Sequence, residues 1–130
     1  DVVIGLMATD GTIQTGIYGR KAKSMKLAMV VPDKEHQAMV MEAIYGEKGV
    51  KAGYTDGYCK EVLLKAAEHL VKDKGAQALI LGCTELPLIL EETDNLKLGD
   101  GHAAIVDPTS SLARRVVKVA GEITKIRGVR

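Results

Sequence analysis

The chain has 130 residues, the length of one ordinary domain, and its 18 basic and 17 acidic side chains leave a formal charge of +1. This near-balance gives no electrostatic attraction to nucleic acid or to an anionic membrane surface. Four Tyr and no Phe or Trp leave few rings on which unpaired bases could stack. No apolar run approaches the ~20 residues of a membrane span, and no signal peptide is visible. We therefore expect a globular protein that binds neither nucleic acid nor membranes.

The cysteines and histidines are few and scattered. Cys59 and Cys83 belong to no CxxC pair, which disfavours a disulfide framework, a structural zinc site and thiol redox chemistry. A reducing cytoplasm is the expected location. His36, His69 and His102 fall in different segments, so no metal centre is expected from neighbours in sequence, and pairing in space stays open.

The first part of the chain alternates short apolar runs with helical patterns. Residues 2–8 form a β-branched run that predicts a strand buried on both faces. Asp10-Gly11 supplies a turn, and Thr12 is expected to cap a helix that continues to about residue 20. A second strand is expected over residues 27–31. Asp33 then caps a clear amphipathic helix.

The middle of the chain begins with an irregular, glycine-rich connection that carries Lys51. Residues 58–74 show the apolar period of a long helix, which Gly75 ends. Residues 78–81 predict a further buried strand. The turn at 82–85 is expected to open another helix from about residue 86.

The last part of the chain holds a brief strand over residues 104–106 and a terminal helix opened by Asp107-Pro108. Strands that alternate with helices predict an α/β protein with an open, doubly wound parallel sheet flanked by helices. Ligands of such sheets bind beyond the carboxyl ends of the strands. The candidate sites are therefore the strand-to-helix turns at residues 9–12, 32–35, 82–85 and 107–109.

Cys83 lies in the most informative of these turns, and two interpretations of it remain open. In the structural interpretation, Gly82 and Cys83 turn the chain tightly, Thr84 caps the next helix and Glu85 favours the positive end of its dipole. In the chemical interpretation, a thiol at a helix N-terminus has a lowered pKa and suits a nucleophile or general base. Cys59 is expected simply to pack.

Two further segments carry candidate binding groups. The turn Thr9-Asp10-Gly11-Thr12 could hold a carboxylate or phosphate through its hydroxyls and backbone N–H groups, and it could equally be a plain helix cap. Lys51, on a loop flanked by glycines, could pair with an anionic substrate or remain solvated.

Four motifs in order resemble the aspartate/glutamate racemase family over nearly the whole chain, from about Val3 to Ala120. They are LMATDGTIQTGIYG, EHQAMVMEAIYGEKGVKAG, ALILGCTELPL and IVDPTSSLA. Cell-wall glutamate racemases usually have His where Glu85 follows Cys-Thr, so the sequence is similar to the aspartate-type branch. Hydantoin racemases and maleate isomerases are more distant relatives with other residues at this turn.

The resemblance implies an isomerase that uses neither PLP nor a metal. In such racemases two cysteines flank the substrate α-carbon: one removes the α-proton as thiolate, and the other delivers a proton to the opposite face. The resemblance assigns roles by position, with no metal ligand among them: catalytic, Cys83; substrate-binding, Thr9, Thr12, Lys51 and Thr84; supporting, Glu85. The implied substrate is a small acidic amino acid.

One departure from the family pattern shapes the expected organisation. The family's first catalytic cysteine lies in a Cys-Asn-Thr turn of an N-terminal half, and this sequence contains no such turn. The chain therefore resembles a C-terminal half. Residues 1–104 would form a racemase-like α/β domain, and residues 105–130 would be a last strand and helix that pack on the absent N-terminal domain.

Such a partial enzyme is expected to be inactive alone and to need an N-terminal racemase half as partner. Homodimers are common among relatives, so a second copy is a further candidate partner. Two other functions stay open: a non-catalytic module that binds a small dicarboxylate, and the activity of a relative such as hydantoin racemase or maleate isomerase.

Overall fold

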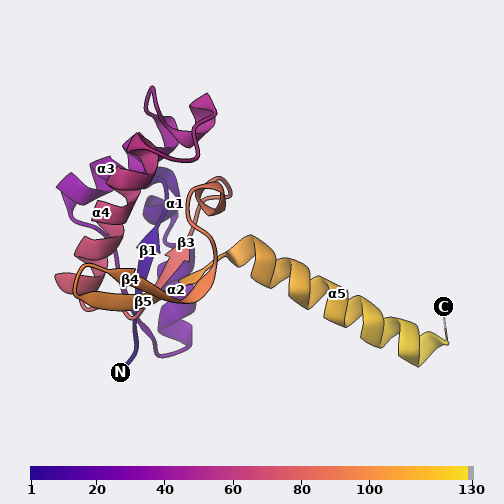
Figure 1. Ribbon diagram of the computed structural model, residues 1–130. Helices are drawn as coiled ribbons and strands as arrows, with labels where there is room; N and C mark the ends of the chain where they lie inside the picture. The colour runs from indigo at the N-terminus through magenta and orange to yellow at the C-terminus, as the bar shows by residue number, and fades with distance from the viewer. Residues whose placement is uncertain (129–130) are drawn as a thin grey trace.

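A five-stranded sheet forms the centre of the protein in the computed structural model, which describes residues 1–128 (Figure 1). The strand order is β2-β1-β3-β5-β4. The first three pairs of neighbours are parallel, and β4 runs antiparallel to β5. The strands are β1 (Val3–Met7), β2 (Ala28–Val30), β3 (Ala78–Leu81), β4 (Thr93–Leu98) and β5 (Gly101–Val106).

Helices connect and flank these strands, which confirms the predicted α/β class with its largely parallel sheet. The α-helices are α1 (Asp10–Thr15), α2 (Ile17–Ser24), α3 (Lys34–Tyr45), α4 (Tyr58–Lys72) and α5 (Pro108–Arg127). Two single 3₁₀ turns, η1 (Val50–Ala52) and η2 (Leu86–Leu88), complete the elements. None of the described helices combines the length and apolarity needed to cross a membrane.

The core lies between the sheet and the antiparallel helix pair α3–α4. Helix α4 buries one face because its apolar residues recur at helical spacing. Its buried residues are Cys59, Val62, Leu63, Ala66, Ala67, His69 and Leu70. Helix α4 packs against β1, β4 and β5 of the sheet.

Two local predictions near the N-terminus need correction. The cap of α1 is Thr9, whose Oγ1 accepts a hydrogen bond from the Thr12 backbone N–H at 3.3 Å, so Thr12 lies inside the helix. The predicted single helix to about residue 20 is two helices, because Gly16 adopts a left-handed conformation with φ of 69° between α1 and α2. Asp33, as predicted, caps α3 by accepting from the His36 N–H.

The segment after β3 differs most from the prediction. The sequence predicted an α-helix from about residue 86, whereas the structure has only the 3₁₀ turn η2, followed by the hairpin β4–β5. Strand β4 escaped prediction because its sequence, TDNLKL, is mostly polar. As the edge strand of the sheet it exposes one face to solvent and lacks the continuous apolar run of a central strand.

Helix α5 leaves the body of the protein and projects away from the sheet (Figure 1). Asp107 caps it, as predicted, by accepting from the Thr109 N–H, and none of its residues is buried. The preceding strand β5 pairs with β3 and buries Ile105. The predicted unit boundary at residues 104/105 remains a prediction, and residues 129–130 of that unit lie outside the described part of the chain.

Candidate functional site

The candidate site lies where β1 and β3 end side by side. Met7 and Leu81 are paired, and the Gly82 N–H donates to the Met7 carbonyl at 2.7 Å. A Cβ on Gly82 would lie 2.7 Å from Leu6 Cδ1 and 3.0 Å from Ala8 Cβ, so β1 leaves room only for glycine. This close approach places the turns at residues 9–12 and 82–85 next to each other.

Glu85 organises the turn that follows β3. Its Oε2 accepts hydrogen bonds from the Cys83 Sγ at 2.9 Å and from the Thr84 Oγ1 at 3.1 Å. Its Oε1 pairs with the Lys51 Nζ at 3.0 Å. One carboxylate therefore joins three predicted site residues, although the sequence assigned Glu85 only a supporting role.

Lys51 reaches this carboxylate from the loop between α3 and α4. The 3₁₀ turn η1 carries it, with Gly49 before and Gly53 after. The ammonium also lies 5.4 Å from the centre of the Tyr45 ring, a distance suited to a cation–π contact. Tyr45, at the end of α3, was not among the predicted site residues, and its role depends on a loop conformation that no local motif specifies.

Charge and burial at Cys83 favour the neutral thiol. Burial raises its pKa, and the hydrogen bond to the Glu85 carboxylate raises it further. The backbone N–H groups of Glu85 and Leu86 act in the opposite direction without reversing the shift. The lowered pKa that the chemical interpretation of this turn implied is wrong, because only a 3₁₀ turn follows Cys83 directly and a negative charge faces the sulfur.

The Glu85 carboxylate is held ionised. The hydrogen bond from the Cys83 thiol, followed by that from Lys51, lowers the pKa of Glu85 from 4.5 to about 2. The pairing with Glu85 in turn raises the pKa of Lys51. At neutral pH the site thus holds a thiol, a carboxylate and an ammonium. The thiol is a proton donor whose proton already points at an acceptor.

The neighbouring turn presents two hydroxyl groups. Thr9 Oγ1 lies 3.1 Å from Thr12 Oγ1, and both side chains are partly exposed. Gln37 of α3 supports this turn from the other side: its Nε2 donates to the Ala8 carbonyl at 2.9 Å and to Asp10 Oδ1 at 2.8 Å. The turn therefore has a fixed backbone with hydroxyl groups at its surface.

Cys59 packs as expected. Its side chain is 0% exposed, and its Sγ donates to the Asp56 carbonyl at 3.3 Å. Cys83, by contrast, contacts the core on one side and is partly exposed on the other. Of the two cysteines, only Cys83 can meet a ligand.

The family model for Asp/Glu/Hydantoin racemase matches residues 2–116. An uncharacterized protein in the pnlA 3′ region of Pectobacterium carotovorum subsp. carotovorum is 32% identical over 117 residues, which cover 88% of this chain and 71% of that protein. The glutamate racemase of Limosilactobacillus reuteri (strain DSM 20016) is 25% identical over 86% of this chain and 39% of its own length.

Two solved structures share the fold. An aspartate racemase homologue from Pyrococcus horikoshii OT3 superposes with a TM-score of 0.72 and 26% identity, covering 92% of this chain and 48% of that one. The aspartate racemase of Picrophilus torridus gives a TM-score of 0.60 and 28% identity, covering 91% of this chain and 45% of that one. The chain thus spans less than half the length of these two proteins.

Proposed function

The chain belongs to the Asp/Glu/hydantoin racemase family, and we propose that its Cys83 is one of two acid/base thiols that invert the α-carbon of a small acidic amino acid. The reaction would be a PLP-independent proton transfer between sulfur and carbon. Racemase relatives place the protein among the isomerases. Substrate, mechanism and the role of each residue are parts of this proposal.

The observation that carries the proposal is the contact between Cys83 Sγ and Glu85 Oε2 at 2.9 Å, with Lys51 on the other carboxylate oxygen. A group that returns a proton to a carbanion must hold that proton before the reaction and exchange it afterwards. The Cys83 thiol holds it, and the Glu85 carboxylate keeps it oriented. The position beyond the carboxyl end of β3 is where ligands of such sheets bind.

The proposed substrate contacts follow from charge. The Lys51 side chain is 43% exposed, so its ammonium would be accessible to a substrate carboxylate. That carboxylate would either replace Glu85 as the partner of Lys51 or share the ammonium with it. The hydroxyls of Thr9, Thr12 and Thr84 would donate to a second carboxylate or accept from the substrate ammonium group. An acidic amino acid offers the two carboxylates and one ammonium that these groups complement.

The proposal requires a second thiol from another polypeptide unit. One base on one face can exchange the α-proton, but inversion needs a proton delivered to the opposite face. Cys59 cannot supply it, because it is fully buried and bonded to the Asp56 carbonyl. We therefore propose that an N-terminal racemase half completes the site. The greater length of the racemase relatives supports this proposal.

Helix α5 offers a surface for that partner. The side chains at positions 112, 116, 119, 123 and 126 are all apolar and recur every three or four residues, which places them on one helix face. None is buried, and Leu112 and Ile126 are 63% and 84% exposed. In the proposed enzyme this face packs on the N-terminal half. A homodimer built through the same face is the alternative outcome.

Exchange and inversion can be measured separately. In deuterated water, ¹H NMR follows loss of the α-proton of L- and D-aspartate, and chiral chromatography follows inversion. We expect the chain alone to give little or no inversion, with any α-proton exchange abolished in Cys83→Ser and retained in Cys59→Ala. Robust racemisation that survives Cys59→Ala would contradict the need for a second unit. Exchange that survives Cys83→Ser would contradict the role of Cys83.

A non-catalytic dicarboxylate-binding module is the second candidate, and the neutral state of Cys83 favours it, because a thiol with a raised pKa is a poor base. This function predicts calorimetric binding of aspartate, weakened in Lys51→Met, with no α-proton exchange under any condition. In either function the two free cysteines support a reducing, cytoplasmic location.

A further inference from the structure

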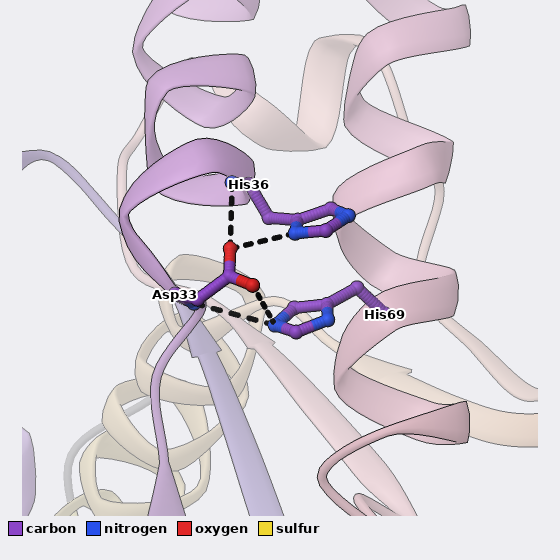
Figure 2. A group of neighbouring side chains, drawn as sticks. All are labelled: Asp33, His36 and His69. Carbon is purple, nitrogen blue, oxygen red and sulfur yellow. Dashed lines mark hydrogen bonds and ion pairs between the residues drawn. The ribbon is translucent and has the colours of Figure 1, made fainter.

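A second polar cluster lies between α3 and α4, away from the turn that carries Cys83. Asp33 caps α3, His36 follows one turn later and His69 faces both from α4 (Figure 2). The two imidazole rings stack with their centres 3.9 Å apart and their planes 5° from parallel. Figure 2 shows the Asp33 carboxylate at the edge of this stack, with one oxygen directed to each ring.

The hydrogen bonds of His69 fix its tautomer. The Nδ1 lies 2.8 Å from Asp73 Oδ2 and must donate, since a carboxylate can only accept. The Nε2 therefore carries a lone pair, which accepts weakly from the Asp33 N–H at 3.3 Å. The same lone pair faces Asp33 Oδ2 at 3.7 Å. The lone pairs of Asp33 Oδ2 and His69 Nε2 thus face each other with no proton between them. His69 is only 6% exposed.

This arrangement has the form of a metal site. The ligand atoms of Asp33, His36 and His69 all lie within 4.8 Å of one another. In a tetrahedral site with metal–ligand distances of about 2.1 Å, ligand atoms lie roughly 3.4 Å apart. The 3.7 Å gap between Asp33 Oδ2 and His69 Nε2 is close to that value. The Asp73 carboxylate behind His69 is the outer partner that metal-binding imidazoles commonly have.

We propose that Asp33, His36 and His69 bind a divalent first-row transition metal ion such as Zn²⁺. Two imidazoles and one carboxylate suit such ions. Two parallel rings cannot both aim a lone pair at one point, so His36, whose side chain is 22% exposed, must tilt out of the stack and give up its hydrogen bond with Asp33 Oδ1. An adjoining cavity of about 310 Å³, lined by His36, His69 and Asp73 among others, has room for water ligands.

The bound ion would join the first turn of α3 to the end of α4 and stabilise the helix pair. Charge at the site permits this: Lys65 and Lys72, which line the cavity, are each paired with a glutamate of α4, at 3.4 Å and 3.6 Å. The proposal does not depend on the racemase function, because Cys83, Glu85 and Lys51 take no part in it.

The test is a titration of the metal-free, untagged protein with Zn²⁺ by calorimetry. We expect one ion per chain, reversal by a chelator and a Tm raised by roughly 10 °C at about 100 times Kd. Co²⁺ should give the visible bands of a four-coordinate ion without a thiolate-to-cobalt band. Absence of saturable 1:1 binding, or a thiolate band, overturns the proposal.

Variants assign the ligands. His36→Gln removes a partly exposed ligand, and Asp33→Asn keeps a good helix cap, so both variants should fold. Each should weaken Zn²⁺ binding at least tenfold, and Asp73→Asn should weaken it roughly 10- to 100-fold. Two control variants should bind Zn²⁺ like the wild type: His102→Gln, which removes the remaining histidine of the chain, on β5, and Cys83→Ser. Unchanged affinity in both His36→Gln and Asp33→Asn, or loss of binding in His102→Gln or Cys83→Ser, contradicts the assignment.

Discussion

Replacing Glu85 by Gln changes the feature on which the candidate site depends, a carboxylate that keeps the Cys83 proton on sulfur. Sγ and Oε2 are 2.9 Å apart, so a thiolate would place two negative charges in contact. At that separation two unit charges repel by about 1.4 kcal/mol even in bulk water, and more where the effective dielectric constant is lower. A free energy of 1.4 kcal/mol corresponds to about a tenfold change in the thiolate population. Both side chains are partly exposed, so the bulk-water figure is the appropriate minimum.

The Glu85→Gln variant should therefore react with iodoacetamide at least about ten times faster than the wild type at neutral pH, where thiolate is the minor form. Alkylation rates between about pH 6 and pH 10, with the labelled cysteine identified by peptide mass spectrometry, separate Cys83 from the buried Cys59. Glu91→Gln, which removes the same charge from an exposed position nearby, is the matched control. Equal or slower alkylation in Glu85→Gln would refute the assignment of Glu85 as the group that holds the proton on sulfur.

Three further predictions concern stability and order. Gly82→Ala should lower the free energy of unfolding by about 1–3 kcal/mol, measured with urea, because its Cβ would lie 2.7 Å from Leu6 Cδ1; an unchanged midpoint would contradict it. The hydrogen bond from the Cys83 thiol, followed by that from Lys51, lowers the pKa of Glu85 from 4.5 to about 2 on folding, so these contacts stabilise the fold above pH 4.5 and their contribution is lost toward pH 2. Urea curves of wild type and Glu85→Gln should differ by less than about 1 kcal/mol at pH 7 and converge in acid. Arg114 of α5 pairs with the Glu92 carboxylate at 2.9 Å and so anchors the start of the helix. Arg114→Ala should speed proteolysis at the base of α5, and an unchanged cleavage rate would exclude that anchoring role.

The parts of the fold that the sequence predicted are those with local causes. The apolar runs of β1, β2 and β3 and the caps Asp33 and Asp107 each depend on a few neighbouring residues. The placement of the candidate turns at one edge of the sheet follows from parallel strand direction alone. These signals need no knowledge of distant contacts.

The features that escaped prediction depend on contacts between distant segments. Glu85 meets Lys51 across 34 residues, and the stack of His36 on His69 requires the antiparallel pairing of α3 with α4. The helix predicted from about residue 86 is also absent because of contacts between distant segments. Leu86 is fully buried, and the chain turns at once into the β4–β5 hairpin, so the tertiary structure overrides a good local helix signal.

The protonation state of Cys83 also bears on the direction of the proposed reaction. A two-thiol racemase begins each turnover with one sulfur protonated and the other ionised, and the ionised one removes the α-proton. Burial and Glu85 favour the protonated form at Cys83. In the free enzyme, Cys83 would then be the donor, and the partner's thiol would be the base. The enantiomer whose α-proton faces Cys83 can react only after the two sulfurs exchange states. Because Lys51 interacts with both the Glu85 carboxylate and the Cys83 sulfur, a substrate carboxylate that binds Lys51 would raise the thiolate's energy further. The proposed site is therefore asymmetric, and kcat and KM should each differ between the two enantiomers, whereas their kcat/KM values must be equal because enantiomers have the same free energy in solution.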